Sequence, residues 1–369
     1  MDKIKAFIDV GVPVYICNFK CKYCYISTWD EFKKKNSTIR IGVQPKLIRK
    51  ALSKKRWGGN LMLNFCGAGE TLLSNELLPI IKELLEEGHY CMIVTNGTIT
   101  PKFEEMSKWS EKIKNRLFIK FSYHYLELKR LKLTNIFFNN VKLMKKSGIS
   151  FTVEVTPSDD YIPYIDDIKK ECFEQIGAFP HITVCRVENG DVPLMSKLPK
   201  KDFINTWKQF DSELFNFKIK IFGEKRKEFC YAGAWSYFLQ LDTGELKQCY
   251  RGRKLQNIYK DIDKSIKREP VGRNCPDPHC WNGHAFLAFG DIPELNTPTF
   301  ADERNRITSD GEWLSNEMKS FMSSKLYETN EVITDEKIKQ KYNRKSLRFN
   351  KNSTIKHKIK NVLKGIIKR

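Results

Sequence analysis

Three cysteines stand close together near the start of the chain, in the stretch CNFKCKYC. Cys17, Cys21 and Cys24 are separated by three and by two residues. Thiolates are soft ligands that favour zinc, copper and iron–sulfur clusters. Structural zinc sites normally close with four ligands, so a loop of three thiolates leaves one metal position open. The spacing therefore predicts an iron–sulfur cluster with one reactive iron, and chance buried cysteines are the alternative.

Apolar runs alternate with segments of helical periodicity over the first 222 residues. Seven runs are typical of strands: VPVYIC, NLMLNFC, CMIVTN, LFIKFSY, ISFTVEV, HITVCRV and FKIKIF. Amphipathic spacing predicts helices at 75–87, 103–114, 136–146, 165–176 and 201–210, with glycines 88 and 148 as helix ends. Repeated strand–helix units predict an α/β fold with a parallel sheet, closed or partly closed as a barrel, and an open doubly wound sheet is the alternative.

The amino-acid composition of the chain changes after residue 222. Glycine, proline, cysteine and short strands follow, including a predicted hairpin in YFLQLDTGELKQC, where Asp242-Thr243-Gly244 supplies the turn. Such a segment has little hydrophobic core of its own and needs a cross-link or a metal site for stability. We therefore divide the chain into a barrel at 1–222, a cysteine-rich domain at 223–300, a wrapping segment at 301–334 and a basic tail at 335–369.

The net charge of +21 is concentrated in the tail. Between Lys337 and Arg369 there are 13 Lys and Arg and no acidic residue. From Ser353 onward, apolar residues recur at helical intervals among lysines, which predicts a basic amphipathic helix that lies on an anionic membrane surface. Docking on the protein's own domain and a disordered tail are alternatives. Nucleic acid is a disfavoured partner because the tail has no interleaved aromatic residues.

The sequence also indicates a compartment. No apolar run reaches eighteen residues, and the first residues, MDKIKAFIDVGVPVYIC, do not have the form of a secretory signal. We therefore expect a cytoplasmic protein, peripheral at the inner face of the membrane if the tail binds lipid. Eleven cysteines in a reducing compartment favour metal binding or catalysis over disulfides.

With its cysteine spacing the chain resembles the radical S-adenosylmethionine (SAM) superfamily. CNFKCKYC has the family's CxxxCxxC signature, and Tyr23 is the aromatic residue that the family favours before the third cysteine. The resemblance implies a partial (β/α)6 TIM-like barrel in which Cys17, Cys21 and Cys24 hold a 4Fe–4S cluster whose open iron binds SAM. Such enzymes cleave SAM reductively to a 5′-deoxyadenosyl radical, which abstracts a hydrogen from the substrate.

A second stretch, NFCGAGET, is similar to the family's glycine-glycine-glutamate-proline turn, which receives the amino group of SAM. Gly67, Gly69 and Glu70 match the turn, whereas Ala68 departs from it and Thr71 stands where proline is usual. Glycines let the backbone approach a ligand closely, and a carboxylate accepts from an ammonium. An ordinary strand-to-helix turn capped by Thr71 is the alternative.

Two further polar residues match positions near SAM in the family. Asn96 lies in VTNGT, which is similar to the usual ending of the third strand, and Ser122 ends LFIKFSY, where relatives place a polar residue near the ribose. Both residue types are also common in ordinary turns and caps. The resemblance implies a cofactor-binding role for each.

The distal cysteines resemble the SPASM region, or its shorter twitch form. Cys230 and Cys249 flank Gly244, and Cys275 and Cys280 follow in CPDPHC. The resemblance implies one auxiliary 4Fe–4S cluster with four thiolate ligands. No cysteine follows Cys280, which favours the twitch form. A zinc site with four cysteine ligands is the alternative.

Residues outside these motifs have simpler interpretations. Four cysteines remain, at positions 66, 91, 172 and 185, and buried structural cysteine is the default for such residues. Cys66 is the exception, because it adjoins Gly67 and could return a hydrogen atom to a substrate radical, as epimerases of the superfamily do. His279 and His284 are expected to be hydrogen-bonding neighbours of the distal cysteines.

The resemblance implies an enzyme of oxidoreductase or epimerase type. SAM and two 4Fe–4S clusters are the expected cofactors, and flavodoxin or ferredoxin is the expected electron donor. The expected substrate is a sugar or alcohol carbon of a small polar molecule or a surface glycan, lipid-linked if the tail binds a membrane. A peptide (RiPP) maturase is an alternative, disfavoured because only sixteen residues precede Cys17. A non-enzymatic metal- and nucleic-acid-binding protein is the other, and it predicts salt-dependent binding without SAM cleavage.

Overall fold

The computed structural model describes residues 2–28, 39–187, 191–280 and 283–350. Within these residues the main sheet has nine strands in the order β6-β5-β4-β3-β2-β1-β7-β8-β9. The first six are parallel to their neighbours: β1 (Ile4–Val12), β2 (Asn60–Gly67), β3 (Tyr90–Thr95), β4 (Leu117–Ser122), β5 (Ser150–Val155) and β6 (His181–Ile182). The predicted large parallel sheet is confirmed. In this order the sheet ends at β6 on one side and at β9 on the other.

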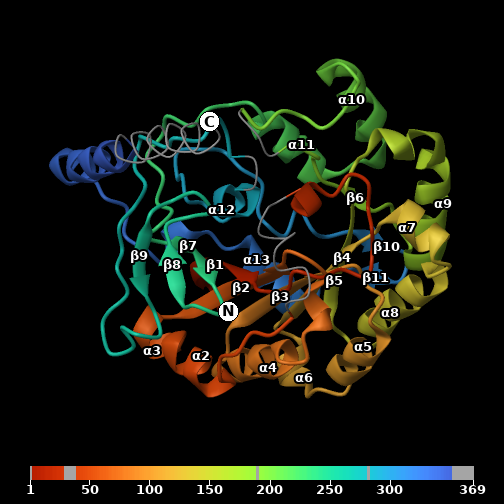
Figure 1. Ribbon diagram of the computed structural model, residues 1–369, viewed down its shortest axis with the longest axis horizontal. Coiled ribbons are helices and arrows are strands. Elements are labelled where there is room, and N and C mark those ends of the chain that lie inside the picture. The colour runs from red at the N-terminus through yellow and green to blue at the C-terminus, as the bar shows by residue number, and fades with distance from the viewer. Residues whose placement is uncertain (1, 29–38, 188–190, 281–282, 351–369) are drawn as a thin grey trace, which may run out of the picture.

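Helices connect the parallel strands and cover one face of the sheet (Figure 1). They are α2 (Pro45–Ala51), α3 (Lys54–Trp57), α4 (Leu77–Glu87), α5 (Thr100–Ser107), α6 (Glu111–Lys114), α7 (Tyr125–Arg130), α8 (Thr134–Lys146), α9 (Ile165–Ile176) and α10 (Lys200–Trp207). Short 3₁₀ turns lie at η1 (Tyr25–Thr28), η2 (Thr71–Leu73), η3 (Asp159–Tyr164), η4 (Lys208–Phe210) and η5 (Leu326–Glu328). Gly88 caps α4 in the left-handed conformation, at φ +94°, as the sequence predicted.

Alternation along the strands divides the apolar residues into two cores. On β1, Ala6 and Ile8 face the connecting helices, whereas Phe7 faces the opposite side of the sheet. We call this opposite side the inner face. At one end the inner face is apolar, with Phe7, Met62 and Phe118 in one cluster. The polar residues of the inner face therefore occupy its remaining part.

Two predicted strands are wrong. FKIKIF belongs to the helix α11 (Glu213–Ile221), whose N-cap Ser212 accepts a hydrogen bond from the Phe215 amide at 3.3 Å. Leu214, Phe217 and Ile221 are buried at helical spacing, and this pattern prevails over the short alternation. VPVYIC is not a strand either, because β1 ends at Val12 and the following proline has no amide to continue the ladder.

The distal hairpin extends the main sheet. β7 (Ser236–Gln240) pairs in parallel with β1, and β8 (Glu245–Lys247) and β9 (Lys254–Asn257) add in antiparallel order. Gly244 adopts φ +71° in the turn, so the predicted hairpin and its glycine are confirmed. A separate two-stranded ribbon joins β10 (Ile307–Thr308) to β11 (Gly311–Glu312).

Later segments return over the inner face. α12 (His284–Ala288) and α13 (Asn316–Ser323) lie on this side of the sheet in Figure 1. Phe286 packs edge-to-face on Phe7 with ring centroids 5.1 Å apart, and Phe321 stacks on Tyr90 at 3.6 Å. The stretch after the last distal cysteine therefore covers the apolar end of the inner face.

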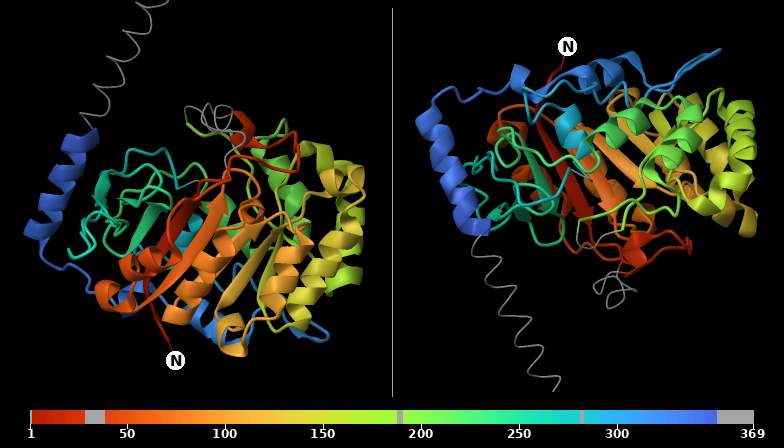
Figure 2. Two further views of the ribbon diagram at one scale, coloured as in Figure 1. Left: turned by 60° about the horizontal axis from the view of Figure 1, so that its bottom comes forward. Right: turned by 90° about the horizontal axis from the view of Figure 1, so that it is seen from above.

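A helix at 336–350 packs on the distal segment, as Figure 2 shows at the side of the molecule. Ser346 donates to the Val271 carbonyl at 2.5 Å, and Asn350 donates to the Asn274 carbonyl at 2.8 Å. The predicted amphipathic helix from Ser353 onward lies outside the described residues and stays a prediction. In the described part of the chain, each helix is too short or too polar to span a membrane.

Candidate functional site

The residues singled out from the N-terminal motifs gather at one edge of the sheet. Cys17 follows β1, Gly67 ends β2, Asn96 follows β3 and Ser122 ends β4. The carboxyl ends of parallel strands lie at the same edge, which is where ligands bind in α/β proteins. The topology thus brings together residues that are up to 105 positions apart in the chain.

The glycine turn is docked on the backbone that leads into the cysteine loop. The Gly69 amide donates to the Val14 carbonyl at 2.7 Å, and the Glu70 amide donates to the Ile16 carbonyl at 2.9 Å. A Cβ atom at Gly69 would lie 1.9 Å from the Ile16 carbonyl oxygen. Glycine is required here because the chain packs against its own backbone immediately before Cys17.

Glu70 joins the glycine turn to the end of β3. Its side chain is 2% exposed, and Oε1 accepts from the Thr95 hydroxyl at 2.6 Å and from the Leu72 amide at 3.0 Å. Oε2 accepts from the Asn96 amide at 2.7 Å. Burial raises the pKa of Glu70, and these hydrogen bonds oppose the shift. A carboxylate has about four acceptor positions, so Glu70 can accept one more donor.

Asn96 connects β3 to the cysteine loop. Its side-chain amide donates to Asn18 Oδ1 at 2.7 Å, and Asn18 in turn donates to the Thr98 hydroxyl at 3.0 Å. Asn18 lies next to Cys17, so the end of β3 holds the first residues of the loop. The structure therefore places Asn96 beside the predicted cluster ligands, with a positioning contact to the loop.

The three N-terminal thiols lie in a tight loop and influence one another. The Cys24 amide donates to the Cys21 carbonyl at 3.1 Å, and the Phe19 amide donates to Cys17 Sγ at 3.4 Å. Burial raises the pKa of Cys17 to about 11 and that of Cys21 to about 12, and neighbouring thiolates add to both shifts. The donor set fits an iron–sulfur cluster in ligand type and number. Among the described residues, no three His, Cys, Asp or Glu side chains are arranged to hold a single metal ion.

An aromatic chain supports the middle cysteine. The Tyr23 hydroxyl lies 2.5 Å from His124 Nδ1 and 2.8 Å from the Tyr161 hydroxyl. Although burial raises the pKa of Cys21, a hydrogen bond from Tyr23 opposes that rise. His124 follows Ser122 by two residues, so this chain connects the end of β4 with the loop. Ser122 itself is half-buried and pairs in register with Glu154 on β5.

The distal cysteines surround one cavity. It has a volume of about 60 Å³ and is lined by all four, Cys230, Cys249, Cys275 and Cys280. Burial raises the pKa of each thiol, that of Cys249 to about 12. Four thiolates around one space are a donor set suited to an auxiliary cluster. Of the two nearby histidines, His279 lies 3.1 Å from the Val192 carbonyl oxygen and His284 lies 2.7 Å from Arg304 Nη2.

Sequence reasoning missed a polar layer on the inner face. Asp9 on β1 is 2% exposed and accepts from the Asn64 amide at 2.8 Å. Burial raises the pKa of Asp9 to about 7. Burial raises the pKa of the Cys66 thiol on β2 to about 12. The nearby Asp9 carboxylate and, more weakly, Glu70 contribute to this rise. The available signal was a lone charge inside an apolar run, IKAFIDVGV.

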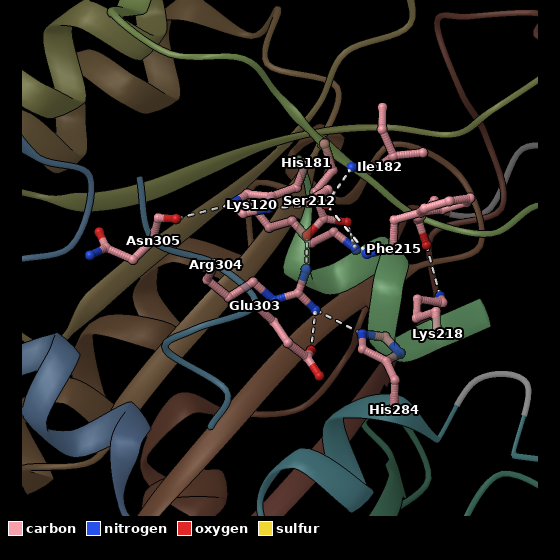
Figure 3. Close-up of polar contacts among 12 residues, drawn as sticks. Lys120, His181, Ile182, Ser212, Phe215, Lys218, His284, Glu303, Arg304 and Asn305 are labelled. Atoms are coloured by element: carbon pink, nitrogen blue, oxygen red, sulfur yellow. Dashed lines mark hydrogen bonds and ion pairs between the residues drawn. The ribbon is translucent and has the colours of Figure 1, made fainter. Parts of the chain in front are cut away.

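The same layer continues into a cluster of buried charges. Glu154 on β5 pairs with Lys120 on β4 at 2.8 Å and with Arg304. Figure 3 shows Arg304 between Glu303 and His284, the latter rising from α12. A lone charge in LFIKFSY and in FTVEV is the sequence signal for Lys120 and Glu154, whereas FKIKIF contains the buried Lys218 together with the exposed Lys220.

Comparisons with known proteins give similarities of fold. No model of a known family and no curated protein matches the chain. Native anSMEcpe with bound AdoMet is 19% identical, with a TM-score of 0.47 over 71% of this chain and 82% of that one. Streptococcus suis SuiB bound to S-adenosylmethionine is 13% identical, with a TM-score of 0.45 over 76% and 66%. BtrN in complex with AdoMet and 2-DOIA is 17% identical, with a TM-score of 0.33 over 71% and 83%. These three are radical SAM enzymes, the superfamily that the cysteine motif resembles.

Proposed function

We propose that the protein is a radical SAM enzyme that oxidises or epimerises an alcohol-bearing carbon of a small polar substrate or glycan. The observation that carries the proposal is the three-thiol loop locked onto the glycine turn, because a Cβ at Gly69 would lie 1.9 Å from the Ile16 carbonyl oxygen. Cys17, Cys21 and Cys24 would hold the cluster. The glycine turn, Glu70 and Asn96 lie next to this proposed cluster position.

SAM and its cluster, when bound, supply a 5′-deoxyadenosyl radical that abstracts a hydrogen atom. The chain's own residues then determine the outcome for the substrate. Asp9 lies on the inner face of β1, the strand next to β2, which carries Cys66. With a pKa of about 7, Asp9 is suited to take a hydroxyl proton near neutral pH. This role favours oxidation of an alcohol to a carbonyl.

Cys66 supports the alternative outcome. Its pKa of about 12 keeps the thiol protonated at neutral pH, so that it retains a hydrogen atom to donate. Return of that atom to the opposite face of a substrate radical would invert the carbon. Asp9 and Cys66 are near enough to interact, so one substrate position serves both roles.

The distal cavity supports a redox role for the second half of the protein. Oxidation releases an electron after hydrogen abstraction, and a cluster held by the four distal thiolates would accept it. A small electron carrier of the flavodoxin or ferredoxin type would supply the electron that starts each turnover. Epimerisation through Cys66 would leave a thiyl radical on this residue, which needs one electron and one proton to become a thiol again; a reduced distal cluster would supply that electron.

The test combines metal analysis with SAM cleavage. After anaerobic reconstitution, we expect about eight irons per chain, and about four when Cys17, Cys21 and Cys24 are changed to alanine. Formation of 5′-deoxyadenosine under reducing conditions should be lost in the same variant. Stoichiometric zinc, little iron and no SAM cleavage by the wild-type protein would contradict the proposal and leave a metal-stapled binding protein.

A further inference from the structure

The inner face carries more buried positive charge than negative charge. Lys218 is 5% exposed, Arg304 is 1% exposed and the Lys120 side chain is 20% exposed. A fourth cation, Arg186, is 4% exposed and is close enough to act on the pKa of Lys218. These four side chains come from β4, the segment after β6, α11 and the segment before β10.

One ionised carboxylate is shared by two of these cations. Burial alone would raise the pKa of Glu154. The positive charges of Arg304 and Lys120 instead hold this pKa at about 2. Glu303 lies 3.9 Å from Arg304, but burial raises its pKa to about 8, so it is largely protonated at neutral pH. With Arg186 left out of the count, Lys120, Arg304 and a half-protonated Lys218 are set against one full negative charge, that of Glu154, which leaves an excess of more than one positive charge.

Lys218 contributes to this excess through a buried side-chain amine. Its ammonium donates to the Thr183 hydroxyl at 2.7 Å, and among the described residues no carboxylate oxygen lies within 4.0 Å of it. Burial, followed by Arg186 and Lys120, lowers the pKa of Lys218 to about 7. A buried ammonium without an anion is costly, and the lowered pKa leaves Lys218 about half protonated at neutral pH. A bound anion would favour its charged form.

Lys120 connects this cluster with the proposed reaction site. Lys120 is its most exposed cation and is close enough to Cys66 and to Asp9 to lower the pKa of both. Lys120 pairs in register with Val94 on β3 and with Thr152 on β5, one layer above Phe118. The Thr152 hydroxyl is buried and has no hydrogen-bond partner within the described structure. Polar capacity is thus available next to the exposed lysine.

We infer that the substrate carries a phosphoryl group and that Lys120 and Lys218 bind it on the inner face, with the reacting carbon toward Cys66 and Asp9. Lysine ammonium groups bind phosphate as point charges, and a phosphoryl group can carry two negative charges where a carboxylate carries one. The doubly charged anion also matches an excess of more than one positive charge. The inference rests on the proposed function, and it narrows the substrate to a phosphorylated or phosphate-linked sugar or alcohol.

The experiment measures anion binding to the reconstituted holoenzyme by anaerobic calorimetry. SAM is kept saturating, so that the carboxylate of SAM cannot account for the signal. The probes are inorganic phosphate, glucose 6-phosphate, glucuronate and glucose. We expect both phosphates to bind, glucuronate to bind more weakly and glucose not to bind.

Variants assign the site. Lys218→Met and Lys120→Met should each weaken phosphate binding at least about tenfold, since each removes a charge-assisted hydrogen bond. Lys218→Arg should retain more affinity than Lys218→Met. Lys220→Met is the matched control, because Lys220 is exposed on the same helix, and it should bind phosphate as the wild type does. Thermal melting of each variant shows whether it is folded, and Lys120→Met keeps the test valid if Lys218→Met is not.

The outcomes separate this inference from the proposed function. Absent phosphate binding, equal binding in the Lys220→Met, Lys218→Met and Lys120→Met proteins, or tighter binding of glucuronate would each overturn the phosphoryl assignment. If 5′-deoxyadenosine still forms in that case, the proposed function stands without it. Phosphate binding in a protein that does not cleave SAM would overturn the proposed function and leave the anion site.

Discussion

The two cysteine sites differ in the number and the supply of their thiols. The N-terminal loop offers three thiols at the open carboxyl edge of the sheet, whereas four distal thiols line one cavity of about 60 Å³. Burial raises the pKa of all four distal thiols and of Cys17 and Cys21, and all seven cysteines are partly buried. The two sites therefore differ in ligand number and in how the thiols are supplied, by one short loop in the first and by separated positions of the chain in the second.

The supports of the two sites differ as well. The backbone before the N-terminal loop accepts hydrogen bonds from the Gly69 and Glu70 amides, and the side chains of Asn96 and His124 also contact the loop. The distal cysteines are supported by side chains from later segments, including Phe286 at the cavity and the helix at 336–350. A new atom that meets backbone, as at Gly69, forces the chain to move, whereas one that meets the end of a flexible side chain can be accommodated by rotation of that side chain. We therefore expect single substitutions to affect the two sites to different degrees.

The largest effect is expected for Gly69→Ala. The added Cβ would meet the Ile16 carbonyl, so the cysteine loop must move, and misplacement of this order costs about 100-fold or more in activity. Iron should fall by about four per chain, and 5′-deoxyadenosine formation should be lost. Gly148→Ala is the control for iron content, because the space around Gly148 is open; its φ of +72° makes alanine strained, so this variant should lose some stability but keep its iron. Full iron content in Gly69→Ala would show that the contact is not essential.

Cys275→Ala should affect only the distal site. Loss of one of four thiolates should remove about four irons, while 5′-deoxyadenosine formation stays within about threefold because distant sites act independently. The measurement is iron content together with SAM cleavage, beside the Cys24→Ala variant, in which cleavage should be lost. If both variants lose cleavage equally, the two sites are coupled and the comparison fails.

Asp9→Asn should stabilise the protein at high pH. The pKa of Asp9 is raised from 3.8 to about 7, so the folded state holds a proton that the unfolded chain releases. Stability therefore falls as pH rises from about 4 to 7, by up to roughly 4 kcal/mol. An asparagine carries no such charge. Melting temperatures should favour the variant most above pH 7, and the difference should shrink toward pH 4; a constant difference would contradict the raised pKa.

Tyr23→Phe should change stability less than Asp9→Asn does. The change removes hydrogen bonds to His124 and Tyr161 and should cost about 1–3 kcal/mol of stability, since a buried ring nitrogen loses its partner. SAM cleavage should fall by about tenfold, as for other residues that support metal ligands. Tyr164→Phe removes a hydroxyl from a residue that is 39% exposed and should change neither quantity. An unchanged melting temperature in Tyr23→Phe would show that the aromatic chain is not supporting the loop.

Local patterns in the sequence predicted much of the fold. The helix at 165–176 has the expected bounds, and the glycine of the distal hairpin has the expected conformation. The strand FKIKIF failed because six residues of alternation also fit one face of a helix, and the Ser212 cap lies outside the run. Local reasoning is reliable where the capping and turn residues are inside the pattern.

The candidate site was predicted less completely. The cysteine loop and glycine turn have local signatures, and the structure brings them together. The inner charges have only the weak signature of a charge in an apolar run, and their partners are distant in the chain: Glu154 and Arg304 are 150 positions apart. An isolated lysine or aspartate in an apolar strand indicates burial of a charge but does not identify what neutralises it.

The parallel pairing of β7 with β1 has a consequence for how the protein can be divided. Five residue pairs, from Phe7–Ser236 to Gly11–Gln240, join the distal segment to the strand that leads into the cysteine loop. A chain cut at residue 222 would leave β1 as a bare, mostly apolar edge, open to pairing with other molecules and to aggregation. The two halves are therefore not interchangeable modules: the distal segment completes the sheet as well as carrying its own thiols.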